Sequence, residues 1–140
     1  MLTPDEMISA DDAKQYSPLT LAFLGDCVYE ELVRTELVLK ANMPAKKLHA
    51  EAVKLVRAVY QSEAAHFLLD GHLSEEEEYI FKRGRNSSHI GAPKSAKNSD
   101  YRSATGLEAL FGFLALTGRN DRIKELYRLI RESVAVSEQP

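Results

Sequence analysis

The sequence predicts an all-α protein, and three observations carry that prediction. Apolar residues recur at helical spacing over long segments, whereas no convincing stretch alternates apolar and polar residues as a half-buried strand would. Ser17 and Pro18 stand together, and these residue types are favoured at the N-cap and the first position of a helix. The chain has 140 residues, 44% of them hydrophobic, which suits one core, so we expect a single domain over residues 1–140.

The first predicted helix begins at Ser17 and runs to about Lys40, where Asn42 and Pro44 stop it. A second helix is expected over about 45–69, because apolar side chains recur there every three or four residues, and a glycine follows it. These apolar positions are Leu48, Ala52, Leu55, Val56, Val59 and Phe67.

Ser74 and Glu77 have the spacing of a capping box, which predicts a helix that opens there and continues to about Arg85. Four consecutive glutamates, Glu75 to Glu78, fall in its first turn. We interpret them as favourable charge at a helix N-terminus rather than as a metal site.

The segment 86–98 is polar and contains Ser, Gly and Pro, which is typical of a loop. Two further helices are expected over about 99–117 and 121–134, divided at Gly118. The C-terminal half of the chain is therefore predicted to be helical outside this one loop.

Two carboxylates stand alone inside apolar helical segments. Asp26 lies in the run Leu21 to Val28. Glu108 lies in the run Ala104 to Phe111. An isolated carboxylate in an apolar setting is costly unless it is protonated, paired or bound to a metal. Either the two acids converge on one shared cation, or each is an ordinary helix residue that reaches solvent or a basic side chain.

Glycines accompany both acids. Gly25 precedes Asp26, and Gly106 and Gly112 flank Glu108. Glycine inside a helix costs about 1 kcal/mol relative to alanine, which is tolerated where another backbone or a ligand comes close. We predict that Gly25 and Gly106 face each other, so that their helices approach closely. Plain close packing without a ligand would need the same contact.

Composition excludes several classes of protein. No apolar run is long enough to span a bilayer, and the N-terminus lacks the pattern of a signal peptide, so we expect no membrane association. The one cysteine, Cys27, has no intrachain disulfide partner, which suits a reducing cytoplasm, where we place the protein. The four histidines lack zinc-ligand spacing, and no Walker-type glycine loop supports nucleotide hydrolysis.

The residues around the two acids resemble the sequence motifs of a known family. The run Leu21 to Asp26, with Phe-Leu-Gly-Asp at its end, is similar to the signature of the ribonuclease III catalytic domain. The run Leu107 to Gly112 is similar to the second acidic motif of that family. The resemblance covers about Ser17 to Ile130. No double-stranded-RNA-binding domain follows, so the sequence most resembles the stand-alone branch called Mini-III ribonuclease.

This resemblance implies a ribonuclease III-like helical bundle that cleaves double-stranded RNA with Mg²⁺ and leaves 5′-phosphate and 3′-hydroxyl ends. Asp26 and Glu108 would be the catalytic, metal-binding acids. The wider family has two further acids where this chain has Ala22 and Thr105, which leaves the number of metal ions open. Glu30 lies one turn after Asp26, and we favour a solvent-exposed or salt-bridged side chain over a role at the metal.

A basic cluster follows the capping box. From Lys82 to Arg102 there are six Lys or Arg residues and one acid, Asp100, in a chain with a net charge of −3. Such a cluster suits phosphate contacts, although a merely soluble loop would have a similar composition. We expect weak base preference, because duplex RNA is read mostly by shape. The predicted RNA-binding residues are Lys82, Arg83, Arg85, Asn86, Lys94 and Lys97.

The resemblance also implies a two-fold homodimer, with Phe23 inserted into the partner subunit; core packing within one chain is the alternative for Phe23. The implied substrate is precursor 23S ribosomal RNA, and a large-subunit ribosomal protein is a further candidate partner. Two rival functions stay open. One is a non-catalytic ribonuclease III-like module that binds RNA or the ribosome, and the other is a small helical interaction protein whose acids are structural.

Overall fold

The computed structural model describes residues 4–87 and 98–137, and every regular element in these ranges is a helix. The prediction of an all-α protein is therefore confirmed. In chain order the elements are the 3-10 turn η1 (Pro4–Glu6) and the helices α1 (Ala10–Ala13), α2 (Pro18–Lys40), α3 (Ala45–Val56), α4 (Ala58–Leu69), α5 (Glu75–Ser87), α6 (Asn98–Leu116) and α7 (Asn120–Ser133). Within the described ranges, no helix combines the length and apolar character that crossing a membrane requires.

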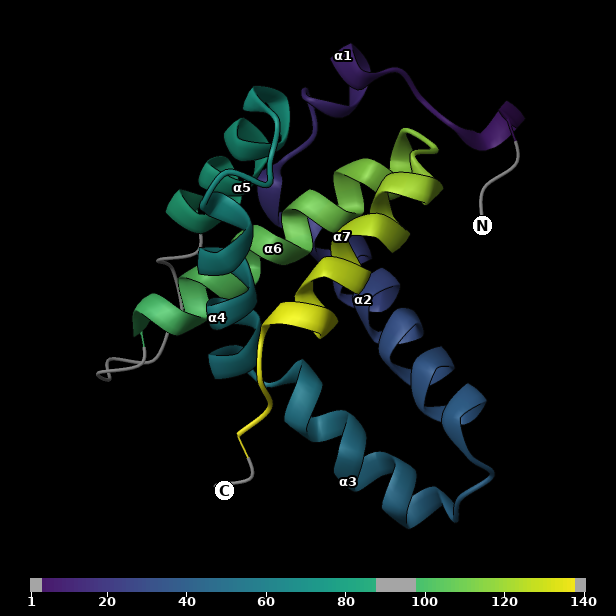
Figure 1. Ribbon diagram of the computed structural model, residues 1–140. Coiled ribbons are helices and arrows are strands. Elements are labelled where there is room, and N and C mark those ends of the chain that lie inside the picture. The colour runs from purple at the N-terminus through teal and green to yellow at the C-terminus, as the bar shows by residue number, and fades with distance from the viewer. Residues whose placement is uncertain (1–3, 88–97, 138–140) are drawn as a thin grey trace.

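Helix α6 lies at the centre of the molecule, with α2, α4, α5 and α7 packed around it (Figure 1). It carries small and apolar residues on all its faces, and a helix of that kind is stable only when it is enclosed. Phe111, Phe113 and Leu114 are fully buried. Helix α3 lies apart from this centre and packs against α2 (Figure 1).

Helices α2 and α6 cross in backbone contact at Gly25 and Gly112. A Cβ atom on Gly25 would lie 1.6 Å from the carbonyl oxygen of Glu108. A Cβ atom on Gly112 would lie 1.9 Å from the carbonyl oxygen of Leu21. Only glycine permits this approach, because any side chain at either position would force the two helices apart.

The prediction that Gly25 faces Gly106 is wrong. Gly106 lies against α5, where its Cβ would be 2.8 Å from the carbonyl oxygen of Phe81. Gly84 of α5 lies beside it, since a Cβ there would be 3.1 Å from the Cα atom of Gly106. With about 3.6 residues per turn, Gly106 and Gly112 lie on different faces of α6. Gly106 therefore allows the close approach of α5, and Gly112 allows that of α2.

The segment predicted as one helix over 45–69 forms two. The chain is extended at Arg57, with φ −70° and ψ 153°, so α3 ends and α4 begins there. Side chains from other positions satisfy the carbonyls that the break leaves open: the Tyr29 hydroxyl donates to Leu55 O at 2.7 Å, and Gln61 Nε2 donates to Val56 O at 2.9 Å. The break lets α3 follow α2 while α4 turns to pack on α6.

Both predicted helix starts are confirmed. Ser17 Oγ accepts from Leu19 N at 3.3 Å, with proline next in the chain. Ser74 and Glu77 form the reciprocal capping box. The backbone N–H of Ser74 donates to Glu77 Oε1 at 2.9 Å, and the backbone N–H of Glu77 donates to Ser74 Oγ at 3.1 Å. Helix α5 continues to Ser87 and so includes two residues, Asn86 and Ser87, that were expected in the loop.

The glutamates at the start of α5 bind basic side chains. Glu76 pairs with Lys14 at 2.9 Å and with Arg119 at 2.5 Å, and Glu77 pairs with Arg122 at 2.8 Å. Among the described residues no group of three or more His, Cys, Asp or Glu side chains could hold a metal. The glutamates therefore lie in the first turn of α5, as predicted, and two of them are paired with basic side chains from other segments.

A polar cluster ties the C-terminal half of α2 to α7. Arg131 of α7 donates from Nε and Nη2 to the two carboxylate oxygens of Glu36, at 2.8 and 2.9 Å. The Tyr127 hydroxyl donates to the same carboxylate at 2.6 Å. The hydrogen bonds from Arg131, followed by those from Tyr127, hold the pKa of Glu36 below its usual value against partial burial.

Candidate active site

The structure brings Asp26 and Glu108 together at one surface pocket. Asp26 comes from α2 and Glu108 from the middle of α6, and each lies next to the glycine crossing that joins these helices. The pocket is lined by Leu19, Ala22, Phe23, Asp26, Tyr101, Thr105 and Glu108. The two acids thus converge although one is near the start of the chain and the other near its end.

Asp26 is exposed, and Glu108 is partly buried. The expectation that Asp26 sits in a wholly apolar surrounding is wrong for a single chain. Helix α2 buries only the face that meets α6 and its neighbours, while the face that carries Phe23 and Asp26 is open. Phe23 is 84% exposed, so the alternative of core packing within one chain is excluded for this side chain.

The surroundings of Glu108 disfavour a second negative charge. Burial, followed by the nearby Asp26 carboxylate, raises the pKa of Glu108 to about 8, while the side-chain amide of Gln61 acts in the opposite direction. Two carboxylates this close are stable together only when a cation lies between them or when one of them is protonated.

The donor set fits a magnesium ion. Magnesium prefers oxygen ligands, keeps several waters, and is commonly held by one or two carboxylates together with phosphate oxygens of the substrate. Asp26 and Glu108 supply those two carboxylates at the surface, where waters and a phosphate can reach them. A pair of acids is too few for a closed protein cage, which agrees with the absence of a three-ligand group among the described residues.

The two positions where the wider family has acids also face this pocket. Ala22 lies one turn before Asp26, and Thr105 lies one turn before Glu108. The Thr105 hydroxyl donates to the carbonyl oxygen of Tyr101 at 3.0 Å, so it supplies an uncharged oxygen rather than a carboxylate. The site is therefore built from two acids and two neutral residues.

The predicted RNA-binding residues on α5 already have partners within the protein. Lys82 pairs with Glu78 at 3.0 Å. Arg83 donates to the carbonyl oxygens of Lys14 and Tyr16, at 3.0 and 3.3 Å, and so fastens the segment that precedes α2. Arg83 therefore has a structural role that the sequence did not indicate.

The remaining members of the basic cluster are Arg85, Asn86, Lys94 and Lys97. Arg85 Nε lies 3.3 Å from Asn86 Oδ1, and its guanidinium lies 5.8 Å from the ring centre of Phe81. Lys94 and Lys97 lie outside the described residues. The structure therefore places only the α5 part of the predicted RNA-binding surface.

Two residues of the site escaped the sequence analysis. Tyr101 is 42% exposed and lines the pocket. Its spacing from Thr105 and Glu108 is helical, so the register of α6 could have revealed it. Gln61 reaches Glu108 from α4, and its position depends on the break at Arg57, where no proline or glycine marks the end of a helix.

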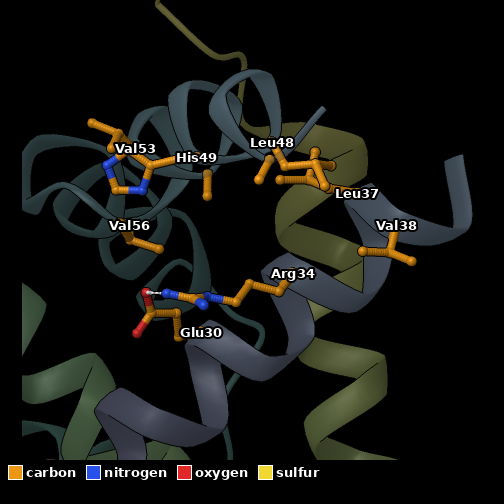
Figure 2. A pocket seen from close by; sticks show the side chains of 10 residues that line it. Glu30, Arg34, Leu37, Val38, Leu48, His49, Val53 and Val56 are labelled. Carbon is orange, nitrogen blue, oxygen red and sulfur yellow. Dashed lines mark hydrogen bonds and ion pairs between the residues drawn. The ribbon is translucent and has the colours of Figure 1, made fainter. Parts of the chain in front are cut away.

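An apolar groove lies on the outer side of α2, between this helix and α3 (Figure 2). Its lining residues are Glu30, Arg34, Leu37, Val38, Ala45, Leu48, His49, Ala52, Val53 and Val56. Glu30 accepts from Arg34 Nη2 at 2.9 Å, so the interpretation of Glu30 as a salt-bridged residue is confirmed (Figure 2). Val38 and Leu39 are 59% and 81% exposed at one end of the groove's helix.

Comparison with known proteins identifies the family. The family model of the ribonuclease III domain matches residues 19–119. The chain is similar to the Mini-ribonuclease 3 of Thermoanaerobacter sp. (strain X514), with 42% identity over 96% of this chain and 92% of that protein. It is also similar to the Mini-ribonuclease 3 of Clostridium tetani (strain Massachusetts / E88), with 38% identity over 89% of this chain and 83% of that protein.

A solved structure agrees with the sequence comparisons. The crystal structure of a protein from Fusobacterium nucleatum aligns with a TM-score of 0.76 and 31% sequence identity, over 86% of this chain and 96% of the other. Both acids and the glycine crossing fall inside the segment that the family model matches. The chain therefore belongs to the ribonuclease III domain family, in the group of the Mini-ribonucleases 3.

Proposed function

We propose that the chain is a magnesium-dependent endoribonuclease that cleaves double-stranded RNA. Membership of the ribonuclease III family supports the activity. The observation that carries the proposal is the meeting of Asp26 and Glu108 in one surface pocket, with a cation needed to keep both acids ionised. Residues 1–140 act as one catalytic domain in this proposal.

The residues of the pocket have separate tasks. Asp26 and Glu108 hold the ion through carboxylate oxygens, and the burial of Glu108 on the central helix fixes the position of its carboxylate. Magnesium, when bound, activates water and neutralises charge on the phosphate under attack. Tyr101 stands half-exposed at the edge of the pocket, where its hydroxyl can donate to a phosphate oxygen. The products carry 5′-phosphate and 3′-hydroxyl ends.

The physiological substrate in this proposal is precursor 23S ribosomal RNA, with a large-subunit ribosomal protein as a further partner. An open pocket on a helical surface suits a duplex that is read by its shape and phosphates rather than by its bases. We place the protein in the cytoplasm, since Cys27 is exposed as a free thiol, which suits a reducing compartment.

A homodimer would supply the two sites that cutting both strands requires. Phe23, Cys27, Glu30, Arg34 and Val38 recur at helical spacing and so follow one face of α2. This face carries the exposed Phe23 ring at one end and borders the apolar groove at the other. Two copies with antiparallel α2 helices would place each ring against the groove of its partner, which is the self-complementary arrangement of a two-fold interface.

The first test is cleavage of a long RNA duplex with Mg²⁺ by the wild type and by Asp26→Asn. The wild type should cut, and Asp26→Asn should lose at least about a thousandfold in rate while folding equally well, because one of the two metal-binding carboxylates is gone. Asp121→Asn, exposed at the start of α7 and outside the pocket, is the matched control and should cut as the wild type does.

The same experiment separates the two rival functions. Ala22 and Thr105 leave the pocket without two carboxylates, which is the observation that favours a non-catalytic binding module. If neither the wild type nor Asp26→Asn cuts and both bind the duplex, that module is the function. If neither binds RNA and Mg²⁺ has no effect on either protein, the acids are structural.

A further inference from the structure

Gln61 is a buried polar residue whose hydrogen bonding is incomplete. Its side chain lies on α4, and the residue is 3% exposed. Its Oε1 atom has no hydrogen-bond partner among the described residues. A buried acceptor without a donor costs about 1–3 kcal/mol, so native structures seldom retain one without a reason.

The orientation of the amide is fixed. Gln61 Nε2 donates to Val56 O at 2.9 Å, at the break between α3 and α4. A flipped amide would bring its oxygen against the Val56 carbonyl oxygen and lose this bond. The oxygen is therefore the atom that stays without a partner.

Gln61 also belongs to the surroundings of the acid pair. Helix α4 packs on α6, and the Gln61 side chain reaches Glu108, the same carboxylate that Asp26 approaches. The side chain thus joins the Glu108 carboxylate to the carbonyl at the end of α3. Asp26 approaches Glu108 from α2, so three elements meet around this carboxylate.

The missing donor has a defined chemistry. Oε1 can only accept, so its partner must carry an O–H or N–H group, and the Glu108 carboxylate beside Gln61 offers none when it is ionised. A magnesium ion held by two carboxylates keeps several waters, each of which donates. Such outer partners orient metal ligands and influence affinity for the ion.

We propose that Gln61 is a positioning residue of the metal site, which holds the Glu108 carboxylate and offers Oε1 to a water that accompanies the cation. This inference rests on the proposed magnesium site. In this inference, the neutral amide of Gln61 takes over part of the role in holding the ion and its waters that a further carboxylate would have.

The test is the affinity for Mg²⁺ without RNA, measured by calorimetry and by the magnesium-induced shift in melting temperature. Gln61→Met has a similar size but no acceptor, and it should weaken Mg²⁺ binding about tenfold. Gln61→Glu adds a carboxylate and should strengthen Mg²⁺ binding, while it lowers the melting temperature of the metal-free protein through repulsion from Glu108.

The matched control is Ser62→Ala, which removes the next buried polar side chain on α4. It should leave the Mg²⁺ affinity as in the wild type. A role limited to capping Val56 would lower the melting temperature of Gln61→Met yet leave its Mg²⁺ affinity unchanged, and that result overturns the inference.

The result also distinguishes this inference from the proposed function. If the wild type binds Mg²⁺ and cleaves RNA while Gln61→Met binds Mg²⁺ equally well, only the role of Gln61 is wrong. If the wild type fails to bind Mg²⁺ in the presence or absence of duplex RNA, the metal site and the role of Gln61 fail together.

Discussion

At the scale of single residues, the two acids are held in unequal surroundings. Glu108 is partly buried in the central helix, whereas Asp26 stands exposed on a helix face that no described residue covers. In the proposed magnesium site, Glu108 would therefore be the fixed ligand and Asp26 the ligand that water and substrate can approach. With Ala22 and Thr105 in place of further acids, we expect Mg²⁺ to bind weakly until an RNA phosphate adds its own oxygens.

Adding a carboxylate to the pocket should raise the affinity for Mg²⁺ in the absence of RNA. Thr105→Asp places a third acid one turn before Glu108, so Mg²⁺ affinity without RNA should rise about tenfold, and the metal-free protein should melt at a lower temperature. Calorimetry and thermal melting measure the two effects. Thr105→Val, with similar shape and no charge, is the control, and equal Mg²⁺ affinity in both variants would contradict the expectation.

The convergence of the two acids on one pocket was predictable because each interrupts an apolar run, and a family motif surrounds each of them. The exposure of Asp26 to solvent was not predictable. Whether a helix face is covered depends on its neighbours, and the open face of α2 around Phe23 has no neighbour within the chain. Gln61 escaped notice for a related reason, since a glutamine in a helix carries no signal until its partner is known.

At the scale of elements, the crossing of α2 and α6 sets the distance between the acids. Gly25→Ala would drive a methyl group into the Glu108 carbonyl, so the helices must separate, at a cost of at least about 3 kcal/mol. Mg²⁺ binding should be lost in the fraction that stays folded. Denaturant unfolding and calorimetry check both effects. Glu31→Ala, exposed on the same helix, should change stability by less than about 0.5 kcal/mol.

The polar cluster of Glu36, Tyr127 and Arg131 between α2 and α7 should make part of the free energy of unfolding depend on pH. The pKa of Glu36 is lowered in the folded state, so its contribution is present above the unfolded pKa of about 4.3 and is lost as the pH falls through the folded value. Glu36→Gln should destabilise the protein by about 1 kcal/mol at pH 7, and the difference should narrow below about pH 4. Urea unfolding at pH 7 and pH 3 measures it; a difference independent of pH would contradict the argument.

Element boundaries followed local signals where such signals exist. The cap at Ser17, the capping box at Ser74 and the stop after Lys40 were predictable because they depend on neighbouring side chains. The break at Arg57 was not, since the local sequence is compatible with a continuous helix and the reason for the break is the packing of α4 on α6. The glycine partners also depend on which helices meet, and helical spacing alone does not decide that.

At the scale of the whole molecule, the exposed face of α2 predicts the state of association. If the proposed homodimer forms, Phe23→Asp should convert it to a monomer, because a charge would replace the ring that is proposed to enter the partner's apolar groove. Sedimentation at micromolar concentration measures the change. Tyr79→Asp alters a ring that is 53% exposed on α5 and should leave the association unchanged. A monomeric wild type would rule out the dimer.

The basic cluster predicts how the molecule responds to salt. Alanine at both Lys94 and Lys97 should weaken binding of duplex RNA and make the logarithm of affinity fall less steeply with the logarithm of salt concentration, by about 1 to 2 in slope. A salt titration of binding measures this. Lys46→Ala with Lys47→Ala, at the exposed start of α3, removes the same charge elsewhere and should have a smaller effect.

The central position of α6 affects how the protein folds while it is being synthesised. Asp26 leaves the ribosome early and Glu108 late. Helix α6 can be enclosed only when α2, α4 and α5, which precede it in the chain, are available to pack against it. Contacts between such distant parts of a chain form late in folding, and a domain made on the ribosome completes itself as its last segments emerge. We therefore expect a nuclease of this architecture to become active only after the segment that forms α6 has left the ribosome.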